Sequence, residues 1–213
     1  MRNKEDIKRR YDKLYSVAYG HKKSGVKSPT TSSHVESLLS QVGRKLSKSD
    51  IILEIGCGEG NMMFPLCDKV KFMYGVDISK VAIDNAKRFL KDKNNMKLYV
   101  NDNIDFFDDE FFDIIFEQTV FQHMLKEHII EYLDQIKKKL KEGGYLILQF
   151  IDDPSFKEQM GTLDTESQSS WTEEEMIFEI EKRGLYKVKS NIVALSTSNA
   201  GITSTVYLLA RKK

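Results

Sequence analysis

An apolar run meets a glycine-rich turn in Ile51-Ile52-Leu53-Glu54-Ile55-Gly56-Cys57-Gly58-Glu59-Gly60-Asn61. The apolar run predicts a buried strand, and the apolar residues that follow Asn61 predict a helix. Glycine at alternate positions lets the backbone turn sharply and lets a ligand approach it without meeting a Cβ atom. The free N–H groups of the following helix favour an anionic group at the turn. A surface turn in an unrelated α/β domain is the alternative interpretation.

The composition is that of an ordinary globular protein. The chain has 213 residues, of which 40% are hydrophobic and 31% charged, enough for one domain with a sizeable core. A net charge of +1 gives no basic field that would attract nucleic acid. The charged N-terminus lacks a signal core and no run could span a membrane, so we expect a cytoplasmic protein. Cys57 and Cys67 suggest no disulfide or metal framework, and no metal site is predicted.

Strands and helices alternate through the middle of the chain. The expected strands are 51–55, 70–77, 96–100, 112–117 and 145–150, with helices at 78–90 and 126–140 and a break at Gly143-Gly144. This alternation predicts a parallel sheet with helices on both faces. A capping box at 172–175 then opens a helix to about 183, and strands at 186–193 and 204–210 follow as a hairpin-like pair. Before the sheet, helices are expected at 3–17 and 33–46.

The turn departs from the dinucleotide fingerprint G-x-G-x-x-G, because Asn61 holds its last position and the third glycine comes one residue early. Its pattern, E-x-G-x-G-x-G, resembles motif I of the class I S-adenosylmethionine-dependent methyltransferases of the small-molecule type, similar to the ubiquinone and tellurite-resistance group. The resemblance covers roughly residues 50–213. It implies a Rossmann-like fold with a seven-stranded, mostly parallel sheet, an antiparallel last strand and helices on both faces. It also implies a glycine loop under the methionine and ribose of the cofactor, formed by Glu54, Gly56, Cys57, Gly58 and Gly60.

In open α/β sheets the ligand lies at the carboxyl ends of the strands. Asp77 ends the second strand, about twenty residues past the glycine turn, where a carboxylate can accept from both ribose hydroxyls. The alternative is an N-cap for the helix that begins at Ile78. The resemblance places Ile78 on the adenine face. It also places Asp102 at the adenine amino group with Asn103 and Ile104 beside it, where an ordinary Asx turn is the alternative.

The segment after the fourth strand is where members of this family place acceptor-binding and catalytic groups. Phe121 and His123 match a pattern found in many small-molecule members, an apolar residue two before a histidine. His123 is the first candidate for a base and Glu117 the second, although His123 could also pack at the start of the next helix. Glu117 could instead hold a cationic amine or contact the cofactor. The nucleobase signature (D/N)-P-P-(Y/F) is absent, which argues against a nucleic-acid acceptor.

The N-terminal residues 1–48 are predicted to form a helical cap over the pocket of a methyltransferase domain at 49–213. Tyr19 is a candidate for both cofactor and acceptor contacts, whereas Tyr11 and Tyr15 are expected to pack on the body of the domain. The predicted acceptor pocket is polar and aromatic, lined by Tyr19, Gln118, Phe121, Gln122 and Trp171.

The expected activity is therefore in-line methyl transfer from S-adenosylmethionine to an oxygen or nitrogen of a small polar acceptor, with S-adenosylhomocysteine as the product. A sugar or a phosphate-bearing precursor of a surface glycan would suit such a pocket. We expect a monomer or homodimer with no nucleic-acid or membrane partner. A non-catalytic S-adenosylmethionine-binding module and an NAD-dependent oxidoreductase are the alternatives.

Overall fold

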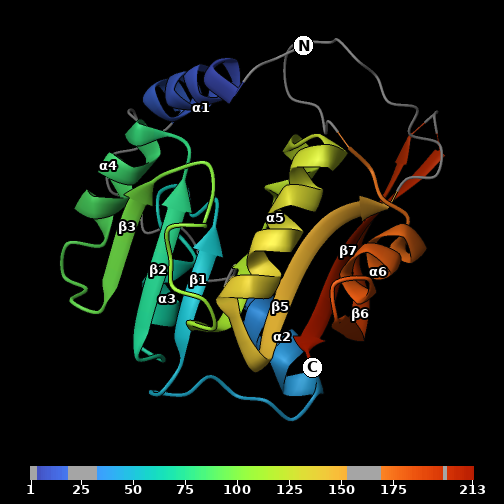
Figure 1. Cartoon of the computed structure of the whole chain (residues 1–213). Coiled ribbons are helices and arrows are strands. Elements are labelled where there is room, and N and C mark those ends of the chain that lie inside the picture. The colour runs from blue at the N-terminus through green and yellow to red at the C-terminus, as the bar shows by residue number, and fades with distance from the viewer. Residues whose placement is uncertain (1–3, 19–32, 153–168, 199–200) are drawn as a thin grey trace.

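The computed structural model describes residues 4–18, 33–152, 169–198 and 201–213. Its centre is a seven-stranded sheet of order β3-β2-β1-β4-β5-β7-β6 (Figure 1). The strands are β1 Ile51–Ile55, β2 Phe72–Asp77, β3 Met96–Val100, β4 Phe112–Glu117, β5 Leu140–Asp152, β6 Leu185–Ser198 and β7 Gly201–Lys212. The helices are α1 Lys4–Ala18, α2 Ser33–Gln41, α3 Met63–Cys67, α4 Lys80–Phe89, the 3-10 turn η2 Phe121–His123, α5 Lys126–Lys139 and α6 Glu173–Glu181.

The sheet is parallel except at one edge. Strands β3, β2, β1, β4 and β5 run parallel to one another, whereas β7 pairs antiparallel with both β5 and β6. The predicted fold class is confirmed, including the antiparallel last strand. The strand order reverses between β1 and β4. In open α/β sheets ligands bind outside the carboxyl ends of the strands near such a reversal.

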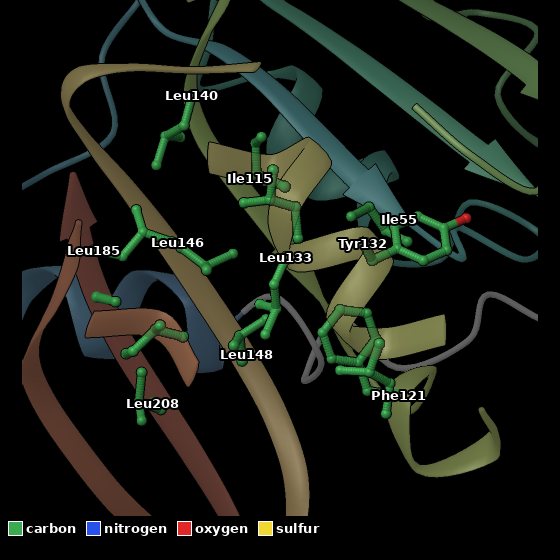
Figure 2. Packing of buried hydrophobic residues seen from close by; sticks show 14 of the residues in the cluster. Ile55, Ile115, Phe121, Tyr132, Leu133, Leu140, Leu146, Leu148, Leu185 and Leu208 are labelled. Atoms are coloured by element: carbon green, nitrogen blue, oxygen red, sulfur yellow. The ribbon is translucent and has the colours of Figure 1, made fainter. Parts of the chain in front are cut away.

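Each face of the sheet is covered by its own apolar cluster. Side chains of α5 and α6 pack on one face, where Ile115, Phe121, Leu133 and Leu148 belong to the same cluster (Figure 2). Side chains of α2, α3 and α4 pack on the other face, against alternate residues of the same strands. Because side chains alternate across a strand, the near-continuous apolar runs of β1 and β4 serve both faces.

Strand β5 begins five residues earlier than predicted. It starts at Leu140, directly after α5, so Gly143 and Gly144 lie inside the strand and do not break a helix. Leu140 is fully buried and pairs with Phe112, and this tertiary contact ends the helix. The three extra residues of β5 are absorbed by a register shift beside Asp113, with Gly143 in the left-handed region at a φ of 74°.

Two helix boundaries also differ from the prediction. Helix α2 ends at Gln41, because Gly43 turns the chain at a φ of 73° and the Arg44 N–H closes the helix end on the Leu39 carbonyl. Helix α4 is capped by Ser79, whose hydroxyl accepts from the Ala82 N–H, so the N-cap considered for Asp77 is wrong. The predicted capping box of α6 is confirmed. None of the helices in the described ranges is long and apolar enough to cross a membrane.

The turn after β1 packs closely against a neighbouring side chain. Gly56 has a φ of 69°, and a Cβ added there would lie 2.2 Å from a methyl carbon of Val120, which precedes η2. The segment after β4 therefore packs directly on the backbone of the glycine turn. Gly184, at the end of α6, has a similar φ of 77° but no atom within 4 Å of an added Cβ.

We predict that Gly56→Ala destabilises the protein more than Gly184→Ala. Both substitutions place alanine in the left-handed region, at a cost of about 1–2 kcal/mol. Only the first adds a steric clash, which costs a further 1–3 kcal/mol or so. Urea denaturation of the two variants measures the difference. Equal losses would show that Val120 moves aside freely.

Candidate functional site

The Asp77 carboxylate ties the glycine turn to the start of α4. Its Oδ2 accepts a hydrogen bond from the Gly58 N–H at 2.9 Å, and its Oδ1 accepts one from the Ser79 N–H at 2.8 Å. The Gly56 N–H donates to the Val76 carbonyl at 2.8 Å on the same neighbouring strand. The turn and the end of β2 therefore form one hydrogen-bonded unit.

This carboxylate is almost completely buried. Asp77 is 8% exposed, and burial raises its pKa, against the effect of its two backbone hydrogen bonds. The Asp12 carboxylate on α1 raises the pKa further. Asp77 also lines the cavity described next.

A cavity of about 380 Å³ lies at the carboxyl ends of β1 and β2. This volume falls in the range of small-molecule sites. Its walls come from α1, the glycine turn, the segments after β2, β3 and β4, and α5. The lining residues are Ile7, Tyr11, Leu14, Tyr15, Ile55, Gly56, Val76, Asp77, Ile78, Asn101, Asp102, Asn103, Thr119, Val120, His123, Met124, His128, Glu131, Tyr132 and Gln135.

Helix α1 forms one wall of this cavity and lies beyond the arrowheads of β1, β2 and β3 (Figure 1). It is held by Asp12, whose Oδ1 accepts from the Ser79 hydroxyl at 2.6 Å and from the Val81 N–H at 3.2 Å. An acidic side chain at the N-terminus of α4 is also favoured by the helix dipole. Helix α2 instead packs Val35 and Leu39 into the core against the sheet.

Tyr11 and Tyr15 both line the cavity, so the expectation that they only pack on the domain body is wrong. The Tyr15 hydroxyl oxygen lies 2.8 Å from where a Cβ on Gly58 would be. Helical spacing made the two tyrosines look like an ordinary apolar stripe. The apolar stripe of α1 does face the domain, but it faces the cavity at the carboxyl ends of the strands. Tyr19 lies outside the described residues.

The segment after β3 reaches the cavity with three polar residues. Asn101, Asp102 and Asn103 line it, whereas Ile104 is fully buried in the core. The Ile104 N–H donates to Gln135 Oε1 on α5 at 2.8 Å, so this N–H is already engaged. Among the predicted adenine contacts, Asp102 and Asn103 are therefore exposed to the cavity and Ile104 is not.

Glu54 and Cys57 lie behind the glycine turn, outside the lining of the cavity. Glu54 is 4% exposed, and burial followed by the nearby Asp77 charge raises its pKa well above its usual value. Within the described part of the chain, Glu54 Oε2 has no hydrogen-bond partner. Cys57 is buried in the cluster that also holds α2 and α3.

The buried Glu117 carboxylate links the end of β4 to the segment that follows it and to β5. Its Oε2 accepts from the N–H groups of Val120 and Phe121 at 3.1 and 3.2 Å, and its Oε1 accepts from the Gln149 N–H at 2.5 Å. Burial raises its pKa to about 7, against the effect of these three bonds. Glu117 is 1% exposed and does not line the cavity, so its geometry is that of a support for the segment after β4.

His123 faces the cavity from η2. Its ring contacts Tyr11 edge to face, with centroids 6.2 Å apart, and its Nε2 lies 3.2 Å from Gln122 Nε2. Burial lowers its pKa below 6.5, and the positive charge of Arg10 lowers it further. The imidazole is therefore neutral at pH 7 and can accept a proton.

The predicted acceptor residues are not brought together around this cavity. Phe121 and Trp171 are both buried in the core cluster beneath α5 and α6. The Lys126 ammonium lies 4.6 Å from the Trp171 ring centroid. Gln118 and Gln122 are absent from the cavity lining as well. Aromatic character alone could not distinguish a lining residue from a core residue.

Sequence analysis missed the wall formed by α5. His128, Glu131, Tyr132 and Gln135 line the cavity from this helix. The spacing of His128, Glu131 and Gln135 places them on one helical face next to the apolar stripe, and this polar face was the available signal. No group of three or more metal-binding side chains occurs within the described ranges.

Comparison with known proteins agrees with this geometry. Residues 53–148 match the family described as a methyltransferase domain. A probable cobalt-precorrin-6B C(15)-methyltransferase (decarboxylating) of Methanococcus vannielii is 50% identical over 48 residues. That match spans 22% of this chain and about a quarter, 26%, of the relative's own length.

Solved structures match almost the whole chain. The magnesium protoporphyrin IX methyltransferase of Synechocystis PCC 6803, crystallised with bound SAM, superposes with a TM-score of 0.70 at 15% identity over 100% of this chain and 98% of that one. A putative sarcosine dimethylglycine methyltransferase of Galdieria sulphuraria gives 0.72 at 15% identity, covering 96% and 98%. The [4+2]-cyclase SpnF gives 0.77 at 13% identity, covering 99% and 97%. At these identities the likeness shows the fold alone.

We predict that Glu117 makes stability fall as the pH rises from about 4.5 to about 7. Its pKa is about 7 in the folded chain against 4.5 for the free side chain. The native state therefore holds the proton longer than the unfolded state, and stability present below pH 4.5 is lost through pH 7. The loss amounts to about 3 kcal/mol at most.

Denaturant unfolding at about pH 5 and about pH 8 measures this loss. Glu117→Gln should shift stability at both pH values and reduce the difference between them, while Glu54 and Asp77, whose pKa values are also raised, keep their share. The exposed Glu174→Gln serves as the control, with an unchanged pH dependence. An unchanged slope in the Glu117 variant would assign the titration to Glu54 or Asp77.

Proposed function

We propose that this chain, which carries a methyltransferase domain of the class I, S-adenosylmethionine-dependent kind, transfers the methyl group of that cofactor to an oxygen or nitrogen of a small polar acceptor. The observation that carries the proposal is the Asp77 bridge between the Gly58 and Ser79 N–H groups at the edge of the cavity. The paired antiparallel β7 and the early third glycine argue against the dinucleotide oxidoreductase.

The residues present fit the cofactor. Asp77 would accept from the ribose hydroxyls, and Asp102 with Asn103 would meet the adenine edge. The unpartnered Glu54 Oε2 is a buried acceptor that suits the methionine ammonium group. The glycine turn provides backbone without Cβ atoms between these groups.

When bound, S-adenosylmethionine supplies a methyl group already activated by a sulfonium, so the chain has no bond-making group to provide. The task of the protein is to align the acceptor with that methyl group and to exclude water. Positioning of this kind contributes about 7–11 kcal/mol in well-oriented reactions. Tyr11 and Tyr15 of α1 would shield the cavity on the solvent side.

His123 is the better candidate for a base. It lines the cavity and its lowered pKa keeps it neutral, whereas Glu117 is occupied by three backbone N–H groups. Its role would be to take a proton from an acceptor that arrives as a hydroxyl or an ammonium group. A native protein that binds S-adenosylhomocysteine but releases none of it from S-adenosylmethionine with any acceptor would instead be the non-catalytic binding module.

The charge of the cavity lining limits the range of possible acceptors. Its described lining contains Asp77, Asp102 and Glu131 but neither lysine nor arginine. A neutral or cationic acceptor suits these charges better than the phosphate-bearing glycan precursor considered from the sequence. Two similar proteins are named for porphyrin- or precorrin-type substrates, but such acceptors carry carboxylates and suit the charges of this cavity less well.

We predict that Asp77→Ala lowers the affinity for S-adenosylhomocysteine by roughly 100-fold or more, since a charge-assisted contact to two hydroxyls is lost. Calorimetry measures the affinity. Asp50→Ala is the matched control, because Asp50 is 3% exposed and also accepts a backbone N–H, from Ser47, but lies at the other end of β1. Affinity retained in the Asp77 variant would mean that the ribose binds elsewhere.

We predict that His123→Asn reduces methyl transfer by roughly 10²–10⁴-fold while S-adenosylhomocysteine binds within a few-fold of the native affinity. The assay is S-adenosylhomocysteine release over a panel of amines, alcohols and a porphyrin. Because the His123 pKa is lowered, the native rate should fall only below pH 6.5. His128→Asn, on the α5 wall, is the control. Full activity in the His123 variant would make this histidine structural.

A further inference from the structure

Three buried oxygen atoms lack a donor at one end of the sheet. Among the described residues, four buried side-chain polar atoms have no hydrogen-bond partner. Three are acceptors, Glu54 Oε2, Gln118 Oε1 and Gln149 Oε1, and the fourth is the Trp171 Nε1 donor. A buried polar atom without a partner costs free energy, so three acceptors gathered in one region require an explanation.

The three residues come from neighbouring strands. Glu54 pairs with Phe116 across β1 and β4, and Phe116 pairs with Ile147 across β4 and β5. Gln149 lies two residues beyond Ile147, so its side chain points to the same face. Gln118 is the first residue after β4 and lies two beyond Phe116. The three residues therefore belong to one face of the sheet, the face covered by α2, with Gln118 and Gln149 in a row two residues further along the strands than Glu54.

Strand β7 extends this row with a hydroxyl group. Tyr207 is the antiparallel partner of Gln149, so the two side chains share a face of the sheet. Its ring is 5% exposed and stacks on His34 of α2, with centroids 4.9 Å apart and planes 6° apart. Burial, followed by the Glu117 charge, raises the Tyr207 pKa to about 12, so the hydroxyl keeps its proton.

The row adjoins the methionine end of the proposed cofactor site. Glu54 lies on the same face and belongs to that site, because it is the residue two before Gly56 and would hold the methionine ammonium group. Gln149, at 4% exposed, and Gln118 then remain as acceptors on the side away from the nucleoside cavity. Acceptor oxygens bind donors, and two amide oxygens beside a hydroxyl suit a group rich in N–H.

We propose that Gln118, Gln149 and Tyr207 form the acceptor subsite, which binds an ammonium or amide N–H group of the methyl acceptor. This inference rests on the proposed function. Of the acceptor residues predicted from the sequence it keeps Gln118, and it adds Gln149 from β5 and Tyr207 from β7, which are 4% and 5% exposed. It also commits the acceptor to a nitrogen-bearing molecule.

Replacement of an unpartnered glutamine by methionine tests whether the buried glutamine oxygens lack a hydrogen-bond donor. Gln149→Met and Gln118→Met should each raise the melting temperature by about 2–4 °C, because an unsatisfied acceptor is removed. Gln135→Met is the matched control and should lower it, because this oxygen accepts the Ile104 N–H. A fall in the first two variants as large as in the control would show that ordered water already satisfies the oxygens, and would overturn the subsite.

Side-chain amide resonances of ¹⁵N-labelled protein test the ligand class, with and without saturating S-adenosylhomocysteine. The probes are ethanolamine, ethylene glycol and acetate, since a side-chain amide can present either end. Ethanolamine should shift the Gln118 and Gln149 resonances, and Gln149→Met should abolish the Gln118 shift. No shift, or a shift with acetate alone, would overturn the inference while S-adenosylhomocysteine binding leaves the proposed function standing. A shift with ethanolamine but no binding of S-adenosylhomocysteine would support the subsite and overturn the proposed function.

Discussion

The structure depends on a single carboxylate that holds a turn and a helix together. Asp77 binds the Gly58 N–H with one oxygen and the Ser79 N–H with the other, so β1, β2 and α4 meet at one side chain. The hydroxyl of the same Ser79 donates to Asp12 and thereby fixes α1. The glycine turn and α1, which both line the cavity, are thus joined through two adjacent hydrogen bonds at Ser79. These bonds set the geometry of the cavity.

Negative charge concentrates around this junction. Glu54 and Asp77 are both nearly buried, and each experiences the charge of another carboxylate. Burial without a counter-charge raises the pKa of a carboxyl group, which is why both are shifted upward. A cationic ligand would relieve this repulsion, and the proposed cofactor carries two positive groups, a sulfonium and an ammonium, against one carboxylate. The site is therefore arranged for a cation before one is bound.

Local signals predicted the fold, the glycine turn and the place of Asp77 at the cavity, because glycine spacing and strand ends can be read from contiguous residues. The glycine turn and Asp77 needed no long-range information. Which side chains are buried depends on how distant strands and helices pack, so Phe121 and Trp171 could not be told from core residues. Gln149 and Tyr207 are more than fifty residues apart, and only the β5–β7 register brings them together. The prediction for Tyr11 and Tyr15 was wrong for the same reason, since helical spacing does not reveal whether an apolar stripe faces the core or a cavity.

The wall contributed by α1 has a thermodynamic consequence. Ile7, Tyr11, Leu14 and Tyr15 belong to the cavity lining, so a molecule held inside touches this helix and the sheet at once. Occupancy and the docking of α1 are then reciprocally linked, and each strengthens the other by the same free energy. Proteolytic cleavage before α2 would separate α1 from the sheet. The sheet would stay intact, but its cavity would be open to solvent and would bind a ligand less tightly.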